Sequence, residues 1–287
     1  MNTDSFALSI SVYPRSSVVN LPSQKVQKMI NAGTELDSVR RFSSRVEYYI
    51  KYRPKYPHEL IDFLKKELGL SSSSVIADVG SGPGVLAEMF LKNGNTVFCV
   101  EPNRGMREAA EKLLREYPNF KSVDGAAEAT TLERESVDFV TAAQAFHWFD
   151  PQKTRAEFSR ILKPGGWAVI LWNSRRTDST PFLKAYESFL QEHSVDYREV
   201  NQKNVDDEAL SRFFAPGGYR KEVFDNAQVF DYESLKGRVL SSSYMPMEGH
   251  PKYEPMIAEL EKIFDEYRSG GTVTFEYDTE MYYGRIQ

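Results

Sequence analysis

Cysteine and histidine are scarce in this chain. Its 287 residues include a single cysteine, Cys99, which excludes a fold stapled by internal disulfides. Because Cys99 lies within the apolar run 96–100, we expect a buried, unreactive thiol. The four histidines are scattered and lack the spacing of metal ligands, so the sequence predicts no metal site: they are His58, His147, His193 and His250.

Long apolar runs and an excess of basic charge are also missing. The run 167–172 is far shorter than the roughly 20 residues that span a bilayer, and the stretch 6–12 is not preceded by the basic residues of a secretory signal. We therefore expect a cytoplasmic protein without a membrane partner. The formal net charge of -5 gives no general attraction for nucleic-acid phosphates, which disfavours a nucleic-acid partner, while the oligomeric state stays open.

Strand and helix patterns alternate through the middle of the chain. This alternation predicts an α/β fold, a Rossmann-like, doubly wound and mostly parallel sheet of seven strands. Two later segments with alternating apolar and polar residues, 221–230 and 271–284, are expected to form its antiparallel edge. The expected strands of the parallel part cover 75–79, 96–101, 120–124, 137–142 and 167–171, and the expected helices cover 57–68, 86–93, 106–117 and 155–162.

Periodicity is weaker at both ends of this core. Residues 1–38 show no clear pattern and are predicted to form an N-terminal arm. The segment 39–287 is expected to form one domain, with a cap inserted at about 174–220. Further helices are expected over 181–193, 206–214 and 253–267.

The strongest motif is the glycine-rich turn 78–84, with the sequence DVGSGPG, between an expected buried strand and an expected helix. Bare backbone at a helix N-terminus allows a ligand to approach closely. A dinucleotide fingerprint would require glycine at position 85, where this chain has Val85, so the spacing disfavours NAD. Glu101 follows at a strand end, where a carboxylate can accept both hydroxyls of a ribose. The pattern therefore predicts a nucleoside ligand without a phosphate in its middle section.

Together with three other segments, this motif resembles the class I S-adenosylmethionine-dependent methyltransferases. The branch it is most similar to is the small-molecule group of methyltransferase type 11, related to trans-aconitate methyltransferase. The resemblance implies an enzyme with S-adenosyl-L-methionine as cofactor, S-adenosyl-L-homocysteine as product, and a small-molecule acceptor such as a small acid. The three segments are YRPKYP at 52–57, AAQAFHWFD at 142–150 and RILKPGGWAVI at 160–170.

The resemblance also implies roles for individual residues. Where relatives often have Asp, this chain has Ala126, so the partner of the adenine amino group stays open between Asp124 and a backbone carbonyl. The implied cofactor residues are Asp78, Gly80, Ser81, Gly82 and Gly84 at the methionine portion, Glu101 at the ribose, Ala126, Ala127 and Glu128 at the adenine, Ala143 and Gln144 at the amino group, Arg53 at the carboxylate, and Tyr52 and Pro102 as further contacts.

Several of these side chains have a plain structural alternative. Arg53 either binds the cofactor carboxylate or packs on neighbouring tyrosines, and Tyr52 either covers the cofactor or simply packs. His147 is a candidate catalytic base or a structural histidine, and it joins Trp148 and Trp172 as a candidate substrate residue.

Rival functions stay open as well: methylation of RNA or protein, or a module that binds S-adenosylmethionine without turnover.

Overall fold

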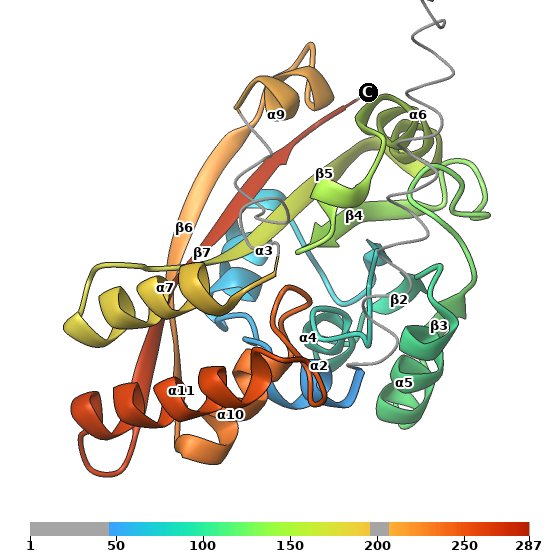
Figure 1. Cartoon of the computed structure of the whole chain (residues 1–287). Helices are drawn as coiled ribbons and strands as arrows, with labels where there is room; N and C mark the ends of the chain where they lie inside the picture. The colour runs from blue at the N-terminus through green and yellow to red at the C-terminus, as the bar shows by residue number, and fades with distance from the viewer. Residues whose placement is uncertain (1–45, 196–206, 287) are drawn as a thin grey trace, which may run out of the picture.

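The computed structural model describes residues 46–195 and 207–286 (Figure 1). The predicted N-terminal arm over 1–38 lies outside the described residues, so it stays a prediction. In the described part of the chain, no helix combines the length and the apolar character that a bilayer crossing requires.

Seven strands form one sheet in the order β3-β2-β1-β4-β5-β7-β6. The first five strands in chain order run parallel to one another, whereas β7 is antiparallel to both β5 and β6. This arrangement confirms the predicted Rossmann-like sheet with an antiparallel edge. The strands are β1 (Val75–Val79), β2 (Thr96–Val100), β3 (Phe120–Val123), β4 (Val137–Ala143), β5 (Leu162–Arg175), β6 (Arg220–Phe230) and β7 (Val273–Gly284).

Helices cover both faces of this sheet, as expected when the strands are buried on both sides. One face packs against α3 (Glu59–Leu68), α4 (Ala87–Lys92) and α5 (Arg104–Leu114). The other packs against α6 (Pro151–Ile161) and α9 (Asp207–Phe213). Cys99 belongs to the first of these cores and is buried, as predicted.

Three helices gather away from these two cores and build a third one. They are α7 (Pro181–His193), α10 (Tyr232–Leu240) and α11 (Tyr253–Tyr267), which Figure 1 shows grouped against one end of β6 and β7. The cap predicted at 174–220 contains only α7 of this group. Helix α10 was not predicted, because five of the six consecutive residues 235–240 are buried and they leave no one-sided apolar stripe in the sequence. These five are Leu235, Gly237, Arg238, Val239 and Leu240.

Strand β5 is longer than the segment 167–171 predicted for it. Its pairing with β4 jumps from Val137↔Leu162 to Phe139↔Trp167, so the residues 163–166 bulge out of the ladder instead of forming a separate turn. At its other end β5 extends beyond β4, because the last pair between the two strands is Ala143↔Leu171. On the β5 side, residues 172–175 therefore pair only with 277–280 of β7, and we call these two paired segments the ribbon.

Candidate functional site

The carboxyl end of β1 carries Asp78, which is almost completely buried. Its Oδ1 accepts a hydrogen bond from the Thr141 hydroxyl at 2.8 Å, while its Oδ2 is buried without a partner. Burial disfavours the charged form and raises the pKa of Asp78 to about 7. This strand end therefore offers a carboxyl group that is able to change its charge near neutral pH.

The glycine loop follows at once, and its three glycines serve different purposes. At Gly80 an added Cβ would lie 2.7 Å from the Ala145 Cβ, and at Gly84 it would lie 2.5 Å from Leu114 Cδ1. At Gly82, whose φ is +54°, an added Cβ would meet nothing within 4 Å. Gly80 and Gly84 thus allow close packing of the protein, whereas Gly82 borders open space.

Glu101 reaches across to this loop from the end of β2. Its Oε2 accepts from the Gly82 N–H at 2.9 Å and its Oε1 accepts from the Asn103 N–H at 2.8 Å. Burial raises the pKa of Glu101, and these two backbone donors oppose that rise. The carboxylate is held in one orientation while its remaining lone pairs stay available. The next residue, Pro102, is exposed, and its carbonyl accepts from Arg107.

The segment after β3 forms a tight turn. Ala126 and Ala129 exchange backbone hydrogen bonds of 3.1 and 3.2 Å, which places Ala127 in the buried core. Glu128 points to the loop before α6, where its Oε1 accepts from the Asp150 N–H at 2.7 Å. Asp124, considered for the adenine, is instead mostly exposed and paired with Arg107 at 2.8 Å.

The end of β4 leads into the aromatic segment. Ala143 forms the last β4 pair, and Gln144 has a φ of +57°, an unusual backbone conformation for a residue other than glycine. Strain of this kind is common at functional sites. The Gln144 amide donates to the Asn173 carbonyl at 3.4 Å, so the end of β4 is tied to the edge of β5.

His147 lies in a short 3-10 helix over Phe146–Trp148. Its Nδ1 is buried without a hydrogen-bond partner, and Trp148 packs beside it with a ring distance of 4.9 Å. Burial, with a further contribution from Arg53, lowers the pKa of His147 to about 4. His147 is therefore neutral at pH 7, and Arg53 lies close enough to affect it electrostatically.

The segment that carries Tyr52 and Arg53 is held by α10 and the residue that follows it. Helix α2 (Val46–Tyr52) ends at Tyr52, whose ring occupies the space beside Gly237 of α10, where an added Cβ would lie 2.1 Å from the ring. Arg53 Nη2 donates to the Ser241 carbonyl at 3.0 Å just after α10. The structure thus brings Arg53 to His147 but places Tyr52 against α10.

Sequence reasoning missed Asn173 and Asn226, which complete this region. Asn173 Oδ1 accepts from the Thr279 hydroxyl at 2.5 Å, and Asn226 Nδ2 donates to the Lys55 carbonyl at 2.8 Å. The only available signal was the polar Asn173 directly after the apolar run 167–172. Asn226 gave no signal, because its role depends on strand pairing between distant segments.

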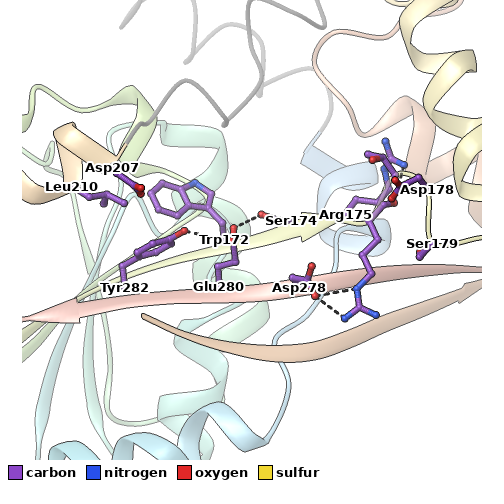
Figure 2. A pocket seen from close by; sticks show the side chains of 12 residues that line it. Trp172, Ser174, Arg175, Asp178, Ser179, Asp207, Leu210, Asp278, Glu280 and Tyr282 are labelled. Atoms are coloured by element: carbon purple, nitrogen blue, oxygen red, sulfur yellow. Dashed lines mark hydrogen bonds and ion pairs between the residues drawn. The ribbon is translucent and has the colours of Figure 1, made fainter. Parts of the chain in front are cut away.

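A cavity of about 490 Å³ lies beside the ribbon (Figure 2). Trp172, predicted as a substrate residue, lines it together with Tyr282 and Glu280. The Phe146 ring, next to His147, lies 6.3 Å from the Trp172 ring. The cavity is therefore near the aromatic segment at the end of β4. Across 46–195 and 207–286, no group of three His, Cys, Asp or Glu side chains is arranged to hold a metal ion.

Comparisons with known proteins agree with this geometry. A family model described as a methyltransferase domain matches residues 77–170, which contain the glycine loop, Glu101 and the aromatic segment. An uncharacterised methyltransferase of Schizosaccharomyces pombe is 27% identical over 252 residues, covering 85% of this chain and 96% of the relative.

An uncharacterised methyltransferase of Mycobacterium tuberculosis is 36% identical over 134 residues, covering 47% of this chain and 52% of the relative. The chain therefore spans about half the length of this second relative. Among solved structures, a candidate type II methyltransferase from Anaeromyxobacter dehalogenans superposes with a TM-score of 0.60 over 82% of this chain and 98% of that one. At 18% identity this likeness concerns the fold alone.

Proposed function

We propose that this chain, which matches a methyltransferase domain over residues 77–170, is a class I S-adenosylmethionine-dependent methyltransferase that transfers the cofactor's methyl group to a small-molecule acceptor held next to His147. The observation that carries the proposal is the Glu101 carboxylate, fixed by the Gly82 and Asn103 N–H groups beside a glycine that borders open space. A buried carboxylate in this position suits the two hydroxyls of a ribose.

The residues present fit such a cofactor. Two polar atoms at the glycine loop, Asp78 Oδ2 and Ser81 Oγ, are buried without a hydrogen-bond partner. Since buried polar groups are normally paired, atoms of this kind are candidates for meeting a ligand. We propose that Asp78, Ser81 and the loop from Gly80 to Gly84 hold the methionine portion, and that Glu101 and Pro102 hold the ribose.

The other predicted contacts surround the same strand ends. Ala126, Ala127 and Glu128 would line the adenine, with a backbone group meeting its amino nitrogen because Asp124 is committed to Arg107. Ala143 and Gln144, at the end of β4, would meet the amino group.

Arg53 would meet the cofactor's carboxylate, for which a guanidinium is well suited. Tyr52 would act indirectly, because its packing against Gly237 fixes the position of Arg53.

When bound, the cofactor supplies a sulfonium-activated methyl group. The chain's own residues then need to orient the acceptor and exclude water. Orientation and exclusion of water account for much of the rate of a reaction that requires an in-line approach. His147 is neutral at pH 7 and has an unpaired Nδ1, so it is able to hydrogen-bond an acceptor, with Trp148 and Trp172 nearby. A pKa of about 4 makes His147 a weak general base, so we propose positioning as its main contribution.

A small acceptor is favoured over RNA or protein by two features. The net charge of -5 opposes attraction of phosphates, and the cavity beside Trp172 has the size of a small-molecule pocket. We further propose that 39–287 forms a single methyltransferase domain, in which the cap comprises α7, α10 and α11.

Calorimetric titration with S-adenosylhomocysteine, with NAD as a control ligand, tests the cofactor site. We expect saturable binding of S-adenosylhomocysteine that weakens about 10- to 100-fold in Glu101→Gln, since a hydrogen bond to a charged group contributes about 1.5–3 kcal/mol. Glu108→Gln, an exposed position on α5, is the matched control and should bind normally. Binding of NAD instead, or full affinity in Glu101→Gln, would contradict the proposal.

A second measurement separates turnover from mere binding. Purified protein with S-adenosylmethionine and a broad set of small molecules should produce S-adenosylhomocysteine with at least one of them. Tight cofactor binding without turnover would favour the non-catalytic alternative, and turnover only with RNA or protein would favour a macromolecular acceptor.

A further inference from the structure

The cavity beside the ribbon has two chemically different ends. Figure 2 shows Trp172, Tyr282, Leu210 and Asp207 gathered at one end, and the polar groups around Arg175, Asp178 and Asp278 at the other. At about 490 Å³ it lies within the usual range for small-molecule pockets.

Its aromatic end contains an unsatisfied donor. Trp172 is 5% exposed, and its Nε1 is buried without a hydrogen-bond partner. The rings of Phe146 and Tyr282 meet the indole edge to face, and neither supplies an acceptor at Nε1. An indole N–H in this state is unfavourable unless a ligand or water supplies an oxygen, so it points to a ligand with a hydrogen-bond acceptor.

The positive charges of the cavity are already matched. Arg175 pairs with Glu187, outside the cavity, and Arg176 pairs with Asp278 at 2.7 Å. No guanidinium is therefore left over to receive an anionic ligand.

The negative charges are in excess. Four carboxylates line the cavity, against two guanidiniums. Glu280 pairs with Lys221, and Asp278 with Arg176. Within the described residues, neither Asp178 nor Asp207 has a cation within 4.0 Å. His147, near the cavity, adds no compensating positive charge because burial keeps it neutral.

We propose that this cavity binds the acceptor, and that the acceptor carries a protonated amino group together with an oxygen that accepts a hydrogen bond. The oxygen meets Trp172 Nε1 and the ammonium group lies near Asp207 or Asp178. The role of this ligand as acceptor rests on the proposed function, whereas its binding in the cavity does not.

Three matched probes test this chemistry. Tyramine carries both the amino group and the oxygen, phenethylamine lacks the oxygen, and 4-hydroxyphenylacetate replaces the ammonium group by a carboxylate. Each is titrated by calorimetry into the full chain, with and without saturating S-adenosylhomocysteine. We expect tyramine to bind at millimolar concentration, and more tightly than either of the other two.

Variants assign the two contacts. Asp178→Asn and Asp207→Asn should together weaken tyramine about two- to tenfold, because carboxylates at an exposed rim contribute little each. Trp172→Phe should weaken tyramine about three- to tenfold and abolish its advantage over phenethylamine. Glu254→Gln, an exposed position on α11 outside the cavity, is the matched control.

Several results would overturn the inference: no binding of tyramine, equal or tighter binding of 4-hydroxyphenylacetate, or unchanged tyramine affinity in the variants. The outcome is separable from that of the proposed function. Failure to bind S-adenosylhomocysteine counts against the cofactor site, while the order of the three probes is measured in its absence as well.

Discussion

At the scale of single residues, the proposed site consists of ionisable groups that the fold has moved from their ordinary pKa values. Asp78 and Glu101 at adjacent strand ends have raised pKa values, and His147 has a lowered one, each chiefly because of burial. In all three, burial shifts the pKa in the direction that favours the neutral form. The cost of keeping such groups out of water is measurable as pH-dependent stability.

For Asp78 the folded pKa is about 7 and the ordinary value is 3.8. A raised folded pKa gives stability that is fully present below pH 3.8 and is lost as the pH rises through 7. At about 1.36 kcal/mol per pKa unit, this loss amounts to about 4 kcal/mol. Asp78→Asn removes this pH dependence, so between about pH 4 and 7 the wild type should lose stability relative to the variant. Urea unfolding at several pH values measures the free energy of unfolding of both proteins. The same pH dependence in the wild type and in Asp78→Asn would show that Asp78 does not titrate in this way.

For His147 the sign is opposite, because its folded pKa of about 4 lies below the ordinary 6.5. Its contribution is present above pH 6.5 and is lost as the pH falls through 4. Relative to His147→Gln, the wild type should lose about 3 kcal/mol over that interval. The same unfolding series measures it, and a relative gain in wild-type stability on acidification would contradict the assignment.

At the scale of elements, α10 links the cap to the cofactor side of the sheet. Tyr52 packs against Gly237, and Arg53 is bonded to the Ser241 carbonyl directly after the helix. A second connection runs from the Gln228 amide of β6 to the Tyr52 carbonyl at 3.4 Å. The position of Arg53 beside His147 therefore depends on elements far away in the sequence.

Gly237→Ala tests this dependence. The added methyl would collide with the Tyr52 ring, at an expected cost of about 1–3 kcal/mol that exceeds the gain of about 1 kcal/mol in helix propensity. We expect weaker S-adenosylhomocysteine binding together with reduced stability.

The matched control for that variant is Gly105→Ala in α5. There an added Cβ would lie 3.4 Å from the nearest atom, Asn103 Oδ1, so the substitution should be neutral or stabilising. Equal effects of the two substitutions would refute the role of α10.

Some of these elements could be predicted from the sequence and others could not. Much of the parallel part was predictable because most of its strands are short apolar runs between turn signals, as at Val75–Val79 before the glycine loop. The contacts of α10 were not predictable. Glycine is required at position 237 because the ring of Tyr52, far away in the sequence, occupies the space beside it. Nor could the sequence show that Asn173 and Asn226 meet, since strand register alone brings them together.

At the scale of the whole molecule, the described segments 46–195 and 207–286 build three hydrophobic cores. Two lie on opposite faces of the sheet and support the glycine loop, and the third joins the cap helices to the far ends of β6 and β7. The ribbon connects these parts. Stability of the cap and affinity for the cofactor are therefore expected to be partly separable.

Leu260→Ala in α11 tests that separation. Leu260 is completely buried in the third core, so its truncation should cost about 2–5 kcal/mol. Hydrogen exchange should accelerate most in α7, α10 and α11, with less change in β1 and α4. Leu113→Ala on α5, where the side chain is 47% exposed, is the control. Uniform acceleration throughout the described residues would indicate a single cooperative unit instead.

The position of β7 also has a consequence for the order in which the chain folds during synthesis. Strand β7 lies between β5 and β6, yet it begins only at Val273, long after β6 ends at Phe230. While the ribosome is still adding the intervening helices, β6 has no neighbour to pair with. The glycine loop is able to form early from β1, β2 and β4, whereas the cavity beside the ribbon requires Asp278, Glu280 and Tyr282 of β7. A nascent chain would thus gain the proposed cofactor site well before it gains the cavity proposed for the acceptor.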